Sequence, residues 1–508
     1  MKKFIYATLA LAAVLLFASC KNDKNQPKNE AGDAYVSFTF NLPDEGLRAN
    51  AADVAGANHG DFYKGTDKEQ AIKNVRVVLY DPTSGQVKYS LDYSISATGG
   101  NPATGEISGT ATAAKFTTKG KEVVKQAYQM LAIINPTSKI SAATEVGKSI
   151  TDAMLAIESN PEELSQNGEA IVMTNDRGLV EVKATQLKEN QGAAEGAPVS
   201  VSVDRILAKV FVNQDAQMKL PKGVTFTNVK WQLNTTNKKT FIFRQFGKVV
   251  TTMDNFVDET ATDASTRINR YAKDPNYQGF VAADFNSFTG DNTLTLKNDL
   301  TFASDKGEYC LENTMDADQQ KHNQTTSFIL RGTWKPADHD GMTFTATATW
   351  YSYKGGFTIT TAKMKEYVAI VKDGTKDAII DIPYTPAGFK AALKKAVVTD
   401  QVLKIDNNGD VEKSGVFGDI KAYKDGICFY QTNLIRHFTN SQSSKEMGYG
   451  RYGVVRNNIY KVNIKEITRP GEPTVVPEDN GNDDPTKVFI AFDITINPWI
   501  VRTQDISL

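Results

Sequence analysis

Two short segments near opposite ends of this chain share one pattern of apolar and polar residues. In residues 34–43 polar positions alternate with the apolar Val36, Phe38, Phe40 and Leu42. In residues 487–508 a similar alternation contains Val488, Ile490, Phe492, Ile494 and Ile496. Alternation at every second position is typical of a β-strand with one buried face. A proline, which cannot donate to a ladder, closes each pattern.

Two strands with one pattern are able to fill the same groove of a folded domain. When the two segments are aligned, Phe38 and Phe492 stand at matching positions. If the first strand were removed, the second strand of another copy would fit in its place, because main-chain hydrogen bonds and alternate side chains carry such an exchange. The repeated pattern therefore indicates a polymer built by strand addition.

The overall composition limits the classes of fold and function. A length of 508 residues suits about two or three domains. The formal net charge of −1 gives no electrostatic footprint for nucleic acid and no polybasic anchor. Four His and three Cys leave little material for a metal site, and we predict no cofactor. Cys310 and Cys428 could pair, but two buried small apolar residues are an equally good interpretation.

The first twenty residues are typical of an export signal. A short basic start precedes an apolar run, residues 4–17, which is too short to span a bilayer comfortably. The run ends in Ala-Ser-Cys, which resembles a bacterial lipobox, so Cys20 is the predicted lipidation site. The alternative is an ordinary signal peptide with an incidental cysteine. Residues 21–33 are polar, without an apolar period, and we predict a flexible tether there.

A small and polar segment, residues 44–61, follows the first strand. Segments of this composition are exposed and easily cut. Arg48 is the first arginine of the chain and lies just beyond the strand. On position alone, Arg48 is better interpreted as a solvated surface residue. The alternative is a proteolytic cleavage site between Arg48 and Ala49.

The rest of the chain is predicted to be mostly β, with antiparallel strands forming two sandwich domains. Apolar or alternating runs predict strands at residues 74–80, 127–134, 199–212, 224–233, 240–246, 325–334, 342–351, 427–429 and 458–464. Two helices are expected, over residues 141–157 with Ser141 as N-cap and over residues 385–397 with Thr385 as N-cap. Two long polar segments, residues 254–276 and 305–323, have the character of loop insertions.

Composition shifts divide the chain into segments. Residues 189–198 have linker composition and mark the predicted domain boundary. The proline-containing residues 469–486 are predicted to be a flexible linker, with a fully extended reach of roughly 50–60 Å. The predicted organisation is a signal peptide 1–20, a tether with a removable first strand 21–48, an N-terminal sandwich 49–198, a C-terminal sandwich 199–468, a flexible linker 469–486 and a donor strand 487–508.

Candidate catalytic and cofactor motifs are not supported by their surroundings. Residues 448–453 match G-x-G-x-x-G, but a predicted strand rather than a helix follows, so the helix N-terminus of a dinucleotide site is missing. The Asp-rich segments 406–410 and 479–484 have neither the glycine at the sixth position nor the closing glutamate that an EF-hand loop requires. We predict that the chain is not an enzyme. An enzyme acting on glycans would need paired carboxylates, for which the sequence gives no positive sign.

Several short motifs carry a resemblance to a known family. They are the lipobox-like start, the first strand before Arg48, and the segments 134–136 (INP), 172–175 (VMTN), 203–210 (VDRILAKV), 452–460 (YGVVRNNIY) and 496–499 (INPW). Together they resemble the Bacteroidales fimbrillins, specifically the Mfa-like stalk subunits of type V pili. The resemblance covers nearly the whole chain, and its most specific pieces are residues 456–460 and Pro498-Trp499.

The resemblance implies a fold and a route of assembly. In that family two transthyretin-like β-sandwich domains are exported as a lipoprotein to the outer membrane. An arginine-specific protease then removes the first strand, and Arg48 matches the cleavage position. A C-terminal strand of the next subunit fills the groove, and residues 487–508, with Trp499, match that strand. The implied partners are other copies of the chain, accessory pilus subunits and the protease.

Two functions from different classes follow from these observations. The favoured one is a structural subunit that polymerises into a cell-surface fimbrium, or pilus, and supports adhesion. The alternative is a monomeric outer-membrane lipoprotein that binds a glycan or a host protein. The repeated strand pattern favours the polymer, because a monomeric binder has no use for it. The C-terminal strand also favours a stalk subunit over a tip subunit.

Overall fold

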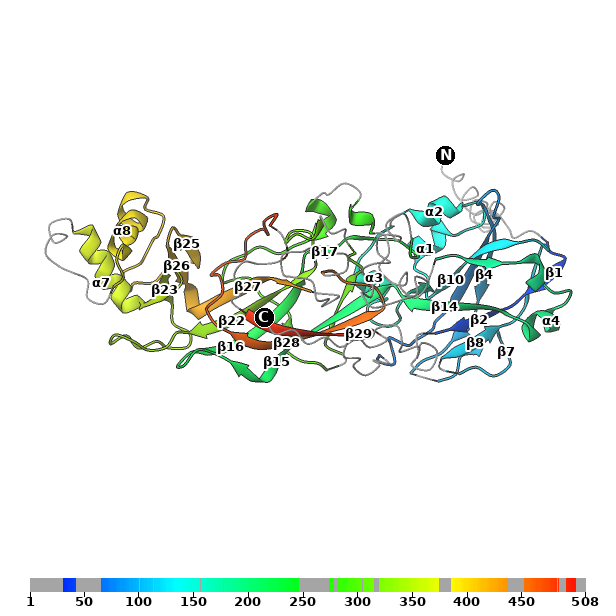
Figure 1. Cartoon of the computed structure of the whole chain (residues 1–508), viewed down its shortest axis with the longest axis horizontal. Coiled ribbons are helices and arrows are strands. Elements are labelled where there is room, and N and C mark those ends of the chain that lie inside the picture. The colour runs from blue at the N-terminus through cyan, green and yellow to red at the C-terminus, as the bar shows by residue number, and fades with distance from the viewer. Residues whose placement is uncertain are drawn as a thin grey trace, which may run out of the picture.

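The computed structural model describes residues 31–42, 65–99, 101–112, 114–155, 157–176, 178–245, 274–277, 282–303, 305–314, 319–373, 385–435, 452–481, 483 and 490–498. This part of the chain is mostly β, as predicted, and forms an elongated molecule (Figure 1). An N-terminal β-domain lies at one end and a C-terminal sandwich in the middle. A module with helices α7 (Thr361–Lys372) and α8 (Phe389–Lys394) lies at the other end.

The N-terminal domain is built on one nine-stranded sheet with the order β4-β3-β10-β12-β14-β2-β8-β7 and with β13 beside β10. Its strands are β2 (Phe38–Asn41), β3 (Val75–Tyr80), β4 (Val87–Tyr93), β7 (Ile107–Ser108), β8 (Lys115–Thr118), β10 (Tyr128–Ile134), β12 (Met173–Asn175), β13 (Val180–Val182) and β14 (Val199–Arg205). In β3, Val77 and Leu79 are buried in one apolar cluster, and Val78 and Tyr80 in another. Because successive side chains point to opposite faces, the sheet is covered on both faces.

Short helices cover one of these faces. Helices α1 (Ser138–Ala143), α2 (Ile150–Met154) and α3 (Pro161–Leu164) each contribute one buried side chain to the apolar cluster there. The single helix predicted over residues 141–157 is therefore wrong. Thr137, not Ser141, caps α1, and Gly147 takes a left-handed φ of 91° that turns the chain before α2 begins.

The C-terminal domain is a sandwich of two four-stranded sheets, with the orders β21-β15-β28-β29 and β20-β16-β22-β27. The strands are β15 (Leu207–Lys219), β16 (Thr225–Asn234), β20 (Asn298–Asp299), β21 (Glu308–Leu311), β22 (Ser327–Lys335), β27 (Ile427–Leu434), β28 (Asn458–Ile467) and β29 (Ile490–Pro498). Alternate residues Val210 and Val212 of β15 share one core cluster with Trp231 and Leu233 of β16. The strand β21 lies inside the segment that was expected to be a loop insertion, residues 305–323.

Two strand pairs depart from the antiparallel prediction. Strand β2 runs parallel to β14, and β15 runs parallel to β28. A parallel pair needs a long connection, and the partners in both pairs are separated by many intervening elements. The remaining pairs of the nine-stranded sheet and of the two sandwich sheets are antiparallel.

The module at the far end has its own four-stranded sheet, in the order β24-β23-β26-β25. Its strands are β23 (Trp350–Tyr353), β24 (Phe357–Thr360), β25 (Gly415–Phe417) and β26 (Ile420–Tyr423), and π-helical residues Lys395–Thr399 extend α8. The strand predicted at residues 342–351 is wrong for most of its length, because only its last two residues enter β23. Helix α8 follows Gly388, which takes a left-handed φ of 84°, rather than the predicted cap Thr385.

Smaller pairs and one more helix complete the described elements. The pairs are β1 (Ala34–Val36) with β9 (Lys121–Val123), β5 (Ile95–Ser96) with β6 (Thr104–Gly105), β11 (Ile157–Glu158) with β18 (Lys239–Thr240), and β17 (Thr236–Asn237) with β19 (Phe285–Asn286). The linker-like residues 189–198 contain helix α4 (Gln191–Gly196), capped by Asn190. The chain passes from the N-terminal to the C-terminal sheet later, at Ile206, between β14 and β15.

A buried polar network joins the two domains at this crossing. Arg244 donates to one carboxylate oxygen of Asp204 at 2.6 Å, and Asn457 donates to the other at 2.8 Å. Arg456 pairs with Glu312 at 2.8 Å. All five side chains are buried. Buried charges of this kind are tolerated when they are paired and hydrogen-bonded, so the network fixes how the two domains meet.

A second buried ion pair crosses the same junction. The Glu69 carboxylate accepts from Lys209 at 2.8 Å and from the Tyr309 hydroxyl at 2.6 Å. Burial alone would raise the pKa of Glu69. The charge and hydrogen bond of Lys209, with help from Tyr309, outweigh burial and hold that pKa below its ordinary value of 4.5. The Glu69 carboxylate is therefore ionised at neutral pH.

We expect Glu69→Gln to lower the free energy of unfolding by about 3–5 kcal/mol, because Lys209 would remain buried without its counter-charge. The stabilisation by the wild-type pair is fully present above the ordinary Glu pKa of 4.5 and is lost as pH falls below it, through the lower folded-state pKa. Chemical denaturation at neutral and acidic pH measures both effects. The control is Glu169→Gln, which removes an exposed pair with Lys68 and should leave the free energy of unfolding nearly unchanged, because solvent screens exposed charges. Equal losses in the two variants would contradict the role of burial.

Candidate functional site

The first described strands lie inside the N-terminal sheet rather than at its margin. Strand β1 pairs with β9, and β2 is bonded on one side to β14 and on the other to β8 (Figure 1). The chain thus changes partners at Ser37, where the sequence predicted one continuous strand. Because β2 has a neighbour on each side, its backbone groups are paired along both edges.

The apolar side chains of this segment fill the N-terminal core. Val36, Phe38, Phe40 and Leu42 are all buried in one cluster. The ring of Phe40 stacks on Phe116 of β8, with centroids 4.9 Å apart and planes 9° apart. The segment thus anchors the domain through its aromatic and aliphatic side chains.

The polar positions of β2 are matched to the same two neighbours. The hydroxyls of Thr39 and Thr117 lie 2.8 Å apart and are hydrogen-bonded across β2 and β8. On the other side, the Asn41 amide donates to the Ser200 hydroxyl of β14 at 2.9 Å. The polar face of β2 is therefore matched to side chains of both neighbouring strands, β8 and β14.

Removal of β1 and β2 would open a groove in the sheet. Its two rims would be the unpaired edges of β8 and β14, and unpaired edges are templates for another strand. Its floor would lose four buried apolar side chains, each worth roughly 1.5–3 kcal/mol when fully buried. The geometry therefore provides a site for an extended strand of alternating pattern.

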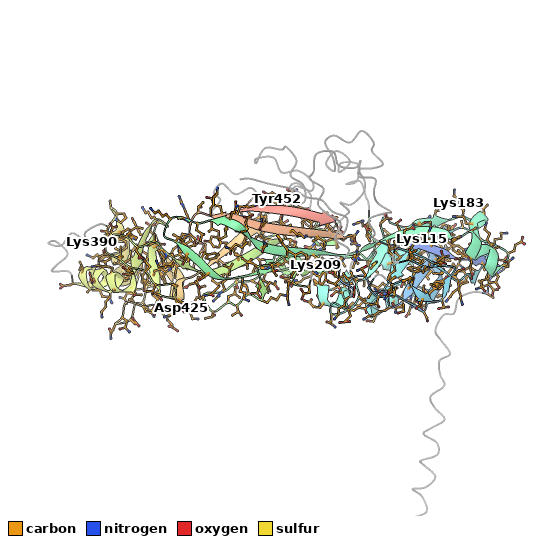
Figure 2. The ribbon with its side chains drawn as sticks, turned by 90° about the horizontal axis from the view of Figure 1, so that it is seen from below. Lys115, Lys183, Lys209, Lys390, Asp425 and Tyr452 are labelled. Atoms are coloured by element: carbon orange, nitrogen blue, oxygen red, sulfur yellow. The ribbon has the colours of Figure 1, made fainter. Side chains whose placement is uncertain are left out.

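The predicted donor segment forms β29 at the edge of a C-terminal sheet. Strand β29 pairs antiparallel with β28 and has no second neighbour among the described strands; Figure 2 shows it in red beside β28. Ile490, Phe492, Ile494 and Ile496 lie within β29. Two further predicted donor residues, Val488 and Trp499, lie outside the described residues.

The segment between β28 and β29 is bound to the C-terminal sandwich at several points. Glu472 forms a bridge with β27, and Val475 forms one with Gly290. Asp483 is buried and accepts a hydrogen bond from Thr325. The predicted flexible linker is thus held to the sandwich in the part that the structure describes, because its extended backbone pairs with neighbouring backbone groups.

The predicted lipidation residue Cys20 and the predicted cleavage residues Arg48 and Ala49 lie outside the described residues. Cys310 and Cys428 are both buried and free. Within the described ranges, no group of three or more His, Cys, Asp or Glu side chains could hold a metal ion. Over the same ranges, no helix combines the length and the apolar character needed to cross a bilayer.

Sequence reasoning does not identify the walls of this groove. Strand β8 has only four residues, which is too short for its alternation to stand out. Strand β14 lies within a predicted strand, but its pattern does not show that β2 is its partner. Pairing between distant segments leaves no periodic trace in the sequence. The polar wall residues Thr117 and Ser200 are therefore visible only in the structure.

The comparisons with known proteins identify the region that contains β27, β28 and β29. Residues 421–505 match the family model described as Major fimbrial subunit protein type IV, Fimbrillin, C-terminal. This part of the chain is similar to the C-terminal region of the fimbrillins. The fimbrillin resemblance predicted from the sequence motifs is confirmed over these residues, and the match points to a structural pilus protein of the cell surface rather than an enzyme.

Solved structures of fimbrial proteins show a weaker similarity. A fimbrilin from Porphyromonas gingivalis W83 is 15% identical, with 93% of this chain and 99% of that chain covered and a TM-score of 0.38. The tip fimbrial protein Mfa3 from Porphyromonas gingivalis, with a C-terminal truncation, is 10% identical, with coverages of 91% and 99% and a TM-score of 0.34. TM-scores this low carry no structural argument, so the similarity to fimbrillins rests on the match over residues 421–505. Curated proteins gave no significant match.

We expect Phe40→Ala to lower the free energy of unfolding of the uncleaved chain by about 3–5 kcal/mol, because it leaves a cavity against Phe116. Urea denaturation of the full-length protein measures the change. The control Asn41→Ala removes a half-buried side chain from the same strand and should cost about 1 kcal/mol. A Phe40→Ala variant as stable as the control would show that β2 does not anchor the domain.

Proposed function

We propose that this protein is a stalk-type pilus subunit that polymerises by protease-triggered donor-strand exchange and supports adhesion. One observation carries the proposal. The N-terminal strand β2 lies between two neighbours, whereas β29, which has the same apolar pattern, lies at a sheet edge beside one neighbour. Removing β2 would create a groove, and releasing β29 would provide a strand that fits it.

The edge position of β29 makes its release less costly than that of an interior strand. Among the described strands β29 is bonded to β28 alone, and each backbone bond lost to the sheet is replaced by a bond to water. Strand β2, by contrast, is bonded to β8 and β14 and buried in the core. The intact chain therefore blocks its own groove, and cleavage is the step that commits it to assembly.

The donor strand brings five apolar side chains to the groove: Val488, Ile490, Phe492, Ile494 and Ile496. At roughly 1.5–3 kcal/mol for each fully buried side chain, the gross gain is on the order of 10 kcal/mol. Ordering the strand and its linker opposes this gain. Each joint of the fibre nevertheless resists detergent, because the strand must leave its groove as one unit.

Maturation would follow from the segments around the first strand. The chain would be exported with lipid on Cys20, which anchors the precursor to the outer membrane through residues 21–33. An arginine-specific protease would cut after Arg48 in a small, polar segment, and the new N-terminus would be Ala49. The predicted domain organisation places all of these positions ahead of the N-terminal sandwich, so one cut would free the groove and detach the anchor together.

We expect subunits isolated from fibres to begin at Ala49 and to carry no lipid. Metabolic labelling with a fatty acid should mark the precursor but not the Cys20→Ala variant. N-terminal sequencing of the fibre protein measures the cleavage position directly. Fibres whose subunits still begin ahead of residue 34 would contradict removal of the first strand, and label on Cys20→Ala would contradict the lipid site.

Deletion of residues 487–508 should leave a folded, cleavable protein that cannot extend a fibre, because no strand remains to fill the next groove. Phe492→Asp should act similarly, since it puts an unpaired charge on the apolar face. The control is Thr495→Asp, which puts the same charge on the polar face and should still assemble. Electron microscopy of cells that express only one variant measures fibre length.

Fibres of normal length from the deletion variant would refute donor-strand exchange. Purified wild-type protein that ran as a single band in detergent without heating would instead favour the monomeric ligand-binding lipoprotein. Detergent-resistant ladders of the wild type, absent from the deletion variant, support the polymer.

A further inference from the structure

The two segments with one pattern align in a way that fixes a register. With Phe492 in the place of Phe38, Ile490 takes the place of Val36 and Ile494 that of Phe40. The incoming strand would then run parallel to β14 and antiparallel to β8, as β2 does. This register keeps every apolar residue of the donor over the N-terminal core, whereas a slip by one residue would turn them outward.

The same register also places the polar residues of the donor. Ala491, Asp493 and Thr495 take the places of Ser37, Thr39 and Asn41 on the outer face of the sheet. The place of Thr39 is nearly closed to solvent, since this side chain is only 4% exposed. A carboxylate there needs hydrogen-bond donors from its two neighbours.

The walls of the groove supply two such donors at the height of Thr39. In the sheet register Thr39 lies opposite Thr117 of β8 and opposite Ser200 of β14. The Thr117 hydroxyl already bonds the Thr39 hydroxyl at 2.8 Å. A hydroxyl donates as readily to a carboxylate, and such charge-assisted bonds are shorter and stronger than neutral ones. Lys115 lies diagonally along β8 and is exposed, which adds a favourable charge.

In the donor's own sheet, Asp493 is in backbone register with Asn463 of β28. The Asn463 amide donates to the Asp215 carboxylate at 2.7 Å, and Lys465 is paired with the same carboxylate at 2.6 Å. The residue opposite Asp493 in this sheet is thus already hydrogen-bonded to another carboxylate.

We propose that Asp493 of one subunit is held between the hydroxyls of Thr117 and Ser200 of the next, and that this contact sets the register of the donor strand. The proposal rests on the donor-strand exchange proposed above and adds a specificity-determining residue to it. The subunit that receives the strand with Asp493 is a second copy of this chain. A slip of two residues would keep the apolar face inward but would move Asp493 away from both hydroxyls, so the contact selects one register among those that bury the same face.

A double-mutant cycle on assembled fibres of the full chain tests the contact. Every subunit supplies both a groove and a donor, so Thr117→Val, Asp493→Ala and the double variant each change every joint alike. The readout is the half-life of fibres in hot detergent. We expect each single substitution to shorten it about tenfold, and the double variant to be no worse than either single one. Thr117→Ser keeps the hydroxyl and should behave as wild type.

The matched control is Thr39→Val, which removes the same kind of hydroxyl from the strand that is discarded. It should weaken the uncleaved precursor in urea but leave the fibre half-life unchanged. Independent losses that multiply in the double variant, or no loss in Thr117→Val, would overturn the contact and its register. Weaker fibres from Thr39→Val would instead show that the first strand is still in place, which contradicts the proposed exchange itself.

Discussion

Backbone pairing on both sides of β2 is the constraint on which the N-terminal domain depends. Ladders with β8 and β14 join parts of the chain that would otherwise end in open edges, and the core closes around the four apolar side chains of residues 34–43. A short N-terminal segment thus completes a sheet whose other strands come from residues 75–205.

The junction between the domains gives a physical meaning to motifs that carried the family resemblance. Asp204 stands at the end of β14 and Asn457 just before β28, and their side chains bond to each other inside the molecule. Asn457 also has a left-handed φ of 61°, a conformation that asparagine tolerates better than most residues. These motif residues therefore have a structural role, since they join the groove-bearing sheet to the sheet that holds β29.

The sequence predicts individual strands better than their partners. Periodicity locates β3, β10, β16 and β22 within a residue or two, because a half-buried strand repeats every second position. It does not reveal that β2 runs parallel to β14, or that Asp204 meets Asn457, because these contacts join segments far apart in the chain. The helix predicted over residues 141–157 fails for a local reason, since one glycine outweighs an apolar spacing that suits a helix.

In the candidate site, too, local patterns are visible in the sequence and contacts between distant segments are not. The apolar residues of the two matching strands are visible in the sequence because alternation is a local property. The hydroxyls of Thr117 and Ser200 are not visible in the sequence, since they flank β2 only through pairing between segments that are far apart in the chain. A groove that exists only after a strand has left has no signature of its own in the sequence.

The bound linker has a consequence for the shape of a fibre. Because Val475 and Asp483 are fixed to the sandwich, only six residues, 484–489, separate the last anchor from β29. Such a segment spans at most roughly 20–25 Å. In the proposed strand exchange, so short a tether would hold the next subunit close against the sandwich that supplies its strand. The spacing along the fibre would then be set by packing between neighbouring subunits, which favours a stiff filament over a flexible one.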